Sequence, residues 1–262
     1  MLAAWMAYNW NEKQGKHHGF GFRANYPNDL VSVESTYAYY GEALDPGLGY
    51  MMRQGIQTFY LKASLNPRPA KGFLAGLVRQ FFFEASGDFY WGLGGELETR
   101  RLSFEPLSFR TESGERFNIN LDVNHDILPF DFEVAKGVIL SAGPYDFTQF
   151  RLSFNTAAHR PLFLDINYTF GGFYSGHYGD VSAGITYRLK GNLDLSFNTN
   201  IVRGTLPEGS FRENVYQVKL DFYFSPDLGL MNYIQYDSVS NLLGWSARFR
   251  WEVTPGNFIY LS

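Results

Sequence analysis

Cysteine is absent from the 262 residues of this chain, which excludes a disulfide framework, a zinc site with thiolate ligands and a thiol nucleophile. Positive charge is scarce as well, because 22 Lys and Arg stand against 26 Asp and Glu, for a formal net charge of -4. No block of basic residues resembles a nucleic-acid footprint. We therefore expect no nucleic-acid partner.

Long hydrophobic runs are also missing, since no stretch approaches the roughly 18 apolar residues of a transmembrane helix. The N-terminus has no basic region followed by a cleavage site, as a signal peptide would, so an exported form would be a mature or trimmed piece. Charged residues make up 18% of the chain and aromatic residues another 18%. Because soluble domains carry roughly 25% charge, this balance is typical of a chain whose apolar surface meets lipid.

Alternation of apolar and polar residues is the strongest pattern that is present. It has the two-residue period of a β-strand with one apolar face. The clearest segments lie in the C-terminal half, at residues 162–170, 181–189, 193–197, 216–224 and 243–251. We expect each of these segments to form a strand.

The N-terminal half repeats the pattern less regularly. Its expected strands are at 3–10, 19–26, 31–39, 58–65, 72–84, 89–100 and 117–123, and the stretch 102–143 is the least regular. Tight turns are expected at 190–192, 225–227 and 254–257, and longer connections at 203–212 and 237–241. This rhythm predicts one domain over 1–262, an antiparallel up-and-down transmembrane β-barrel of about 14 strands, with 16 as the alternative.

The binary pattern by itself fits a soluble sandwich as well as a membrane barrel. Three details favour the membrane. The alternating runs exceed the usual five or six residues of a soluble strand, the polar face contains few lysines, and aromatic residues gather near strand ends as interfacial girdles do. Closure is expected because unpaired backbone edges are unfavourable in lipid.

Five segments have a distinctive sequence, and they are Leu-Asp-Pro-Gly-Leu-Gly-Tyr-Met-Met-Arg-Gln-Gly at 44–55, Phe-Ser-Pro-Asp-Leu at 224–228, Tyr-Ile-Gln-Tyr-Asp-Ser-Val-Ser-Asn at 233–241, Arg-Phe-Arg-Trp at 248–251 and Pro-Gly-Asn at 255–257. Together they resemble a family of uncharacterised Gram-negative envelope proteins. In that family, an N-terminal domain similar to carbohydrate-binding family 9 modules precedes a C-terminal β-barrel domain of unknown function. The resemblance implies a location in the outer membrane of a Gram-negative bacterium.

The chain departs from this family in two respects. The binding-like N-terminal domain is absent, and a further strand with an aromatic end is expected after Ser262. We therefore expect the chain to be a fragment of a longer exported polypeptide. The expected partners are the lipid bilayer and a partner protein or the N-terminal binding domain. The resemblance supplies no catalytic or ligand-binding residues.

Enzymatic chemistry has little support in the sequence. The five histidines are His17, His18, His125, His159 and His177. One of them paired with Ser153 or Ser182 would give an outer-membrane hydrolase, but no Gly-x-Ser-x-Gly elbow is present. A hydrolase is therefore the lowest-ranked alternative, and we expect no enzyme.

Metal binding has two weak candidate sites. His17 and His18 with Glu12 form one, although adjacent side chains diverge on an extended backbone. The other is a calcium-loop spacing through Asp122, Asn124, Asp126 and Glu133, in which Ile127 occupies the position that needs glycine. We expect neither a metal nor another cofactor.

The polar face is the remaining functional candidate. Its expected lumen-lining residues are Glu96, Glu98, Arg100, Asn118, Asn120, Asp122, Asp165, Asn167, Arg188, Asp194, Asn198, Lys219, Asp221, Arg248, Arg250 and Glu252. Mixed charges of this kind line pores that select solutes. We expect a porin-like passive or substrate-selective channel, with a non-conducting membrane anchor or scaffold for a binding domain or partner protein as the alternative.

Overall fold

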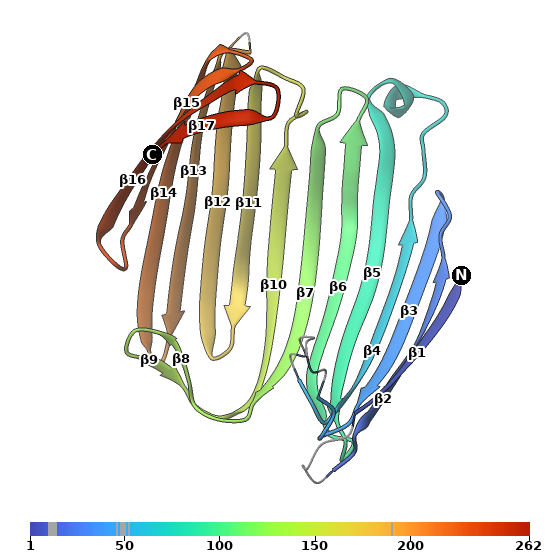
Figure 1. The fold of residues 1–262 in the computed structure, drawn as a ribbon. Helices are drawn as coiled ribbons and strands as arrows, with labels where there is room; N and C mark the ends of the chain where they lie inside the picture. The colour runs from blue at the N-terminus through green and yellow to red at the C-terminus, as the bar shows by residue number, and fades with distance from the viewer. Residues whose placement is uncertain (10–14, 46, 48–50, 52, 190) are drawn as a thin grey trace.

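The computed structural model describes residues 1–9, 15–45, 47, 51, 53–189 and 191–262. Fifteen strands form one antiparallel sheet, and each strand pairs with the next one in chain order (Figure 1). The strands are β1 (Leu2–Tyr8), β2 (His18–Tyr26), β3 (Val31–Tyr40), β4 (Ile56–Leu65), β5 (Val78–Gly92), β6 (Leu97–Thr111), β7 (Arg116–Leu128), β10 (Gly143–Asn155), β11 (Leu162–Phe173), β12 (Gly176–Leu189), β13 (Leu193–Leu206), β14 (Gly209–Ser225), β15 (Leu228–Asp237), β16 (Leu242–Thr254) and β17 (Asn257–Leu261). The predicted all-β, up-and-down antiparallel sheet is confirmed.

A second, two-stranded sheet interrupts the connection between β7 and β10. It consists of β8 (Phe132–Ala135) and β9 (Val138–Leu140). The predicted count of about 14 strands, with 16 as the alternative, is close to the fifteen strands of the main sheet, and the hairpin adds two that were not predicted. None of the described residues forms a helix long and apolar enough to cross a membrane.

Two predicted strands in the N-terminal half are wrong in their bounds. The segment 72–84 begins with a short 3-10 helix, η1 (Phe73–Gly76), and β5 starts only at Val78. The segment 89–100 contains the turn between β5 and β6, in which Gly95 has a φ of 94°. Only glycine adopts such a backbone readily, so Gly95 is the signal that divides this segment.

The predicted loop 203–212 is also wrong. Strand β13 continues to Leu206 and β14 begins at Gly209, so Pro207 and Glu208 alone form the turn. Arg203 and Arg212 are paired positions within the two strands. Their charges interrupt the apolar pattern of one face, although the backbone stays extended.

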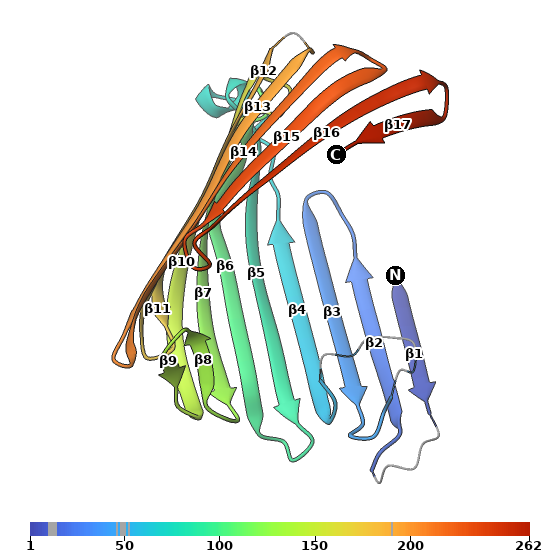
Figure 2. The same ribbon diagram turned by 60° about the vertical axis from the view of Figure 1, so that its left-hand side comes forward.

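The strand register separates the side chains into two faces. Arg101 pairs with Asn124, which pairs with Phe147, and these residues belong to the face that we call inner. Their chain neighbours lie on the opposite, outer face, because successive side chains of a strand alternate. Side chains from β4 through β11 line one hollow on the inner face. The inner face is therefore the concave side of the curled sheet (Figure 2).

The two edges of the sheet, β1 and β17, are not paired with each other, and they stand apart in Figure 2. Every residue of both strands is exposed. Because the number of strands is odd, these two strands run in the same direction. A direct contact between them would therefore be parallel, unlike every other pairing of the sheet.

Candidate functional site

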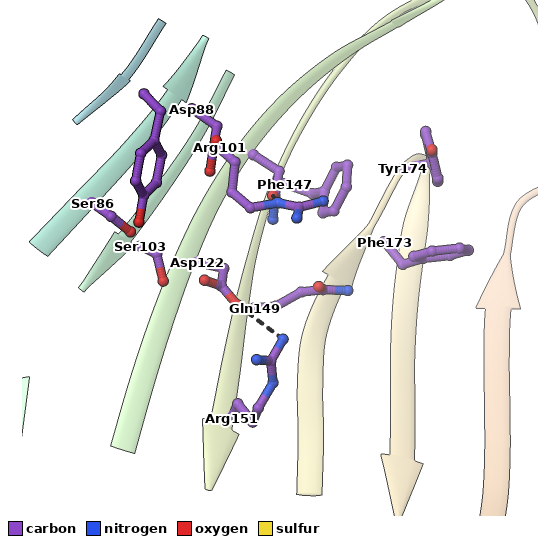
Figure 3. A pocket seen from close by; sticks show the side chains of 12 residues that line it. Ser86, Asp88, Arg101, Ser103, Asp122, Phe147, Gln149, Arg151, Phe173 and Tyr174 are labelled. Atoms are coloured by element: carbon purple, nitrogen blue, oxygen red, sulfur yellow. Dashed lines mark hydrogen bonds and ion pairs between the residues drawn. The ribbon is translucent and has the colours of Figure 1, made fainter. Parts of the chain in front are cut away.

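A hollow of about 440 Å³ lies on the inner face of the sheet (Figure 3). It combines aromatic rings with charged and amide side chains. Its lining residues are Tyr60, Ser86, Asp88, Arg101, Ser103, Asp122, Asn124, Phe147, Gln149, Arg151, Phe173 and Tyr174. A concave site that combines apolar walls with a few polar groups is the usual form of a ligand site.

The register brings one row of lining residues into line across five strands. Tyr60 pairs with Asp88, Asp88 with Arg101, Arg101 with Asn124 and Asn124 with Phe147. Neighbouring strands are about 4.8 Å apart, so these side chains are nearest neighbours on one face. An aromatic ring closes each end of the row, and the charges lie between the two rings.

The charged side chains of the hollow occur as pairs of opposite sign. Asp88 lies directly across from Arg101, and Nη2 of Arg151 lies 3.4 Å from Oδ2 of Asp122. Asp122 is only 6% exposed. The two pairs cancel, so the hollow attracts neither anions nor cations strongly, which suits an uncharged polar solute.

Several hydrogen-bonding groups of the hollow remain free. Nε of Arg101 donates to Oδ1 of Asn124 at 3.3 Å, and this is the one hydrogen bond of its guanidinium group with a described residue. The Asp88 carboxylate accepts none from the described residues. A guanidinium group has five N–H donors, so Arg101 and Asp88 together offer donors and an acceptor to a solute.

Aromatic rings form the wall of the hollow at the end where β11 turns into β12. The ring centroid of Tyr174 lies 5.4 Å from that of Tyr145, 5.2 Å from Phe147 and 4.9 Å from Phe173. The Tyr174 hydroxyl donates to Oδ2 of Asp126 at 3.1 Å. Burial, together with the negative charge of Asp126, raises the pKa of Tyr174 to about 12. The hydroxyl therefore stays protonated and keeps donating at neutral pH.

Tyr174 also has an uncommon backbone conformation, with a φ of 48°. Bulky residues rarely adopt the left-handed region, and such residues cluster at functional sites. Gly or Asn would satisfy this turn position more easily. The tyrosine in this place thus points to a role for its side chain in the wall of the hollow.

The β8–β9 hairpin covers the sheet at the same end. Val138 and Leu140 pack with Leu206 into a buried cluster, and Phe173 and Phe211 contact it. Leu140 is fully buried. Sequence reasoning missed this hairpin, because strands as short as three or four residues give too little alternation to detect.

Most of the predicted lumen-lining residues share the inner face with the hollow. Those that the register places there are Asn118, Asn120, Asp122, Asp165, Asn167, Arg188, Asp194, Asn198, Lys219, Asp221, Arg248, Arg250 and Glu252. Of these, Asp122 alone lines the hollow. The others extend the polar surface across the rest of the sheet.

The remaining three predicted lumen residues belong to one segment. Arg100 pairs with His125 and lies 3.6 Å from Asp146, which places it on the outer face and makes its assignment to the lumen wrong. Glu98 lies at a register irregularity and is 3.5 Å from Arg53, and Glu96 lies in the turn. A bulge inserts one extra residue into a strand, so the side chains after it point to the opposite face from the one that simple alternation predicts. Counting every second residue from Glu96 therefore assigned Arg100 to the inner face, where the structure has Arg101.

The predicted catalytic partners lie on different faces. Ser153 and Ser182 belong to the inner face. His125 lies on the outer face, where its Nδ1 is 2.9 Å from Asp146, and His177 shares that face. No hydrogen bond between described residues joins either serine to a histidine.

The metal candidates are likewise dispersed. Glu12 lies outside the described residues, and Asp122, Asn124 and Asp126 are alternate positions of one strand rather than a loop. The Glu133 carboxylate accepts a hydrogen bond from the backbone N–H of Gly137 at 2.8 Å. Within the described ranges, no three His, Asp or Glu side chains converge so that they could hold a metal ion.

The fold and the hollow are the available guides to function, because comparison with known protein families, with curated proteins and with solved structures finds no match to this chain.

Proposed function

We propose that this chain is the wall of an outer-membrane β-barrel in a Gram-negative bacterium and conducts small polar solutes along its inner face. The observation that carries the proposal is the distribution of side chains over a single curved sheet. Its convex outer face is apolar and uncovered, whereas its concave face is polar and extensively hydrogen-bonded. A soluble protein would bury the apolar face under a second layer.

The apolar outer face is exposed even in the middle of the sheet. Ile166 is 41% exposed, Ile185 41% and Phe197 40%, although each lies on a strand with neighbours on both sides. On β13, the apolar outer positions begin at Leu193 and end at Ile201. That is about the nine residues that a tilted strand needs to cross the hydrocarbon core.

Charged side chains and one imidazole on the outer face mark one end of this apolar band. They lie where the strands approach the β8–β9 hairpin, and they are Arg100, His125, Asp146, Arg203 and Arg212. Charges on a lipid-facing strand are tolerated near the interface and not at the midplane. Their position supports a membrane boundary at this end.

Passage of solute is supported by the polar inner face. Its charges are paired with each other, as in Arg151 with Asp122 and Lys62 with Glu84, whose Nζ and Oε2 are 2.6 Å apart. A closed barrel of this many strands would not be filled by its own side chains. Water and uncharged polar solutes would then occupy the space along the inner face.

The β8–β9 hairpin favours the second candidate function, a non-conducting anchor. It packs at one end of the inner face through Leu140 and Leu206, where a plug would lie. A plugged barrel would hold a binding domain or partner protein at the membrane.

Planar-bilayer recording of the detergent-extracted protein tests the proposal. We expect insertion into the bilayer and steady conductance, because polar side chains cover most of the inner face. Insertion without conductance would favour the anchor, and replacement of 131–141 by a short Gly-Ser linker should then open the barrel. A chain that stays monomeric in buffer without detergent and does not insert would refute both functions.

A further inference from the structure

Two arginines face each other directly on the outer face. Arg203 of β13 and Arg212 of β14 are paired positions of an antiparallel ladder, where Cβ atoms are about 5 Å apart. Both residues are exposed. Like charges in this arrangement are destabilising unless an anion lies between them.

No acidic residue of this surface neutralises the pair. The outer positions of β12, β13 and β14 contain neither Asp nor Glu. Within the described residues, Arg203 has no hydrogen-bond or ion-pair partner, and Arg212 has only Oδ1 of Asn214, 3.2 Å from its Nε. Most of the guanidinium N–H donors are therefore free.

The surroundings leave room for a ligand beside the guanidinium groups. Gly179 is the partner of Arg203 on β12, and a Cβ at Gly179 would meet only the Tyr168 ring, at 4.0 Å. Thr205 and Ser210 are paired positions two residues further along the same face. They place two hydroxyl donors next to the arginines.

The pair also lies where the apolar band ends. On the same face and toward the middle of the band, Ile201 is the next residue to Arg203 on β13, whereas Asn214 and then Tyr216 follow Arg212 on β14. In the proposed membrane orientation, lipid headgroups would lie at this level. Arginine binds phosphate oxygens in a bidentate manner.

We propose that Arg203 and Arg212 form a binding site for the phosphate group of a membrane lipid, with Thr205 and Ser210 as additional donors. This site rests on the proposed membrane function. The acyl chains of the bound lipid lie along the apolar outer face of β13 and β14. The guanidinium groups bind the phosphate, which removes their mutual repulsion.

Electron spin resonance of spin-labelled phosphatidic acid tests the site in phosphatidylcholine vesicles that contain the full chain. We expect the native protein to restrict phosphatidic acid more than phosphatidylcholine. Arg203→Gln and Arg212→Gln should each lower this preference about fivefold, the loss expected for one basic residue near the surface. Arg203→Lys, which keeps the charge, should retain part of it.

Arg100→Gln is the matched control, because Arg100 lies on the same face and at the same end but is paired with Asp146. We expect it to leave the lipid preference unchanged. If the native protein inserts normally but shows no preference for phosphatidic acid, the proposed site is overturned. An equal loss of that preference in Arg203→Gln, Arg212→Gln and Arg100→Gln would overturn it too. Neither result would contradict the membrane function. Displacement of the labelled lipid by inorganic phosphate would show a free-anion site and overturn the lipid assignment. Failure to insert into any vesicle would overturn the membrane function and the site together.

Discussion

The Tyr174 hydroxyl donates a 3.1 Å hydrogen bond to Oδ2 of Asp126, and this bond joins the β11–β12 turn to β7 across the intervening strand β10. Asp126 also accepts a 2.9 Å hydrogen bond from Thr99 of β6. Four successive strands of the sheet are thus tied together at the end where the hairpin docks. The aromatic wall of the hollow depends on this connection.

Tyr174→Phe should destabilise the protein by about 1 kcal/mol, the net contribution of one hydrogen bond, because Asp126 loses a donor while the ring packing is kept. The measurement is urea-induced unfolding of the protein in detergent micelles. Tyr168→Phe is the control, since Tyr168 lies on the outer face, and it should change the unfolding free energy by less than about 0.5 kcal/mol. Equal effects of the two variants would contradict the role of the hydroxyl.

Tyr174 should also make the stability depend on alkaline pH. Its pKa is raised from 10.0 to about 12, so its contribution is fully present below pH 10 and is lost as the pH rises through 12. The difference in unfolding free energy between the native protein and Tyr174→Phe should therefore shrink over that range. A difference that stays constant up to about pH 12 would show that the pKa is not raised.

Glu115 should make the unfolding free energy depend on pH in the acidic range. Hydroxyl donation from Ser113 and Thr111, with Arg160 nearby, holds the pKa of Glu115 at about 2, against an ordinary 4.5. A lowered pKa contributes stability above pH 4.5 that is lost as the pH falls through 2. Glu115→Gln should thus be less stable than the native protein near neutral pH and equal to it at about pH 2.

The matched control for this acid dependence is Glu112→Gln in the same turn, where the side chain is exposed. Its stability should follow that of the native protein at every pH. Urea midpoints of the three proteins over the acid range are the measurement. An effect of Glu115→Gln that does not vary with pH would contradict the prediction.

Leu140→Ala should detach the β8–β9 hairpin, because Leu140 is fully buried against Leu206 and its truncation costs about 2 to 5 kcal/mol. Lys136 is already exposed in the turn between β8 and β9, and detachment should free the backbone around it so that trypsin can bind this segment in an extended form. The rate of cleavage after Lys136 is the measurement. Ile139→Ala, at a neighbouring residue that is 52% exposed, should leave the rate unchanged.

Adjacent residues of β11 should respond oppositely to a new charge. Ile166 lies on the apolar outer face and Asn167 on the inner face. Ile166→Arg near the midplane should lower stability in a bilayer by about 2 to 4 kcal/mol, whereas Asn167→Arg should be tolerated by the polar face. Refolding yield into lipid vesicles measures both. Normal refolding of Ile166→Arg with failure of Asn167→Arg would invert the assignment of the two faces.

The amino-acid sequence by itself determined the architecture of the sheet. Strict alternation over segments such as 181–189 fixes which side chains share a face, since a strand has a period of two residues. Short turns rich in Gly, Pro and Asn then require consecutive strands to pair antiparallel. Most of the strands, their antiparallel order and most of the polar face follow from these local patterns, although β10, β15 and β17 were not among the predicted segments.

Only the tertiary structure decided at which residue the alternation of inner and outer side chains reverses. It also decided which side chains of distant strands are in contact. A bulge near Tyr90 and Trp91 turns Arg101, and not Arg100, toward the inner face, and no local pattern announces such an insertion. The hollow joins side chains from β4 to β11, and Tyr174 reaches Asp126 across another strand. Contacts of this kind depend on the curvature and stagger of the whole sheet, which arise from the pairing of all the strands together.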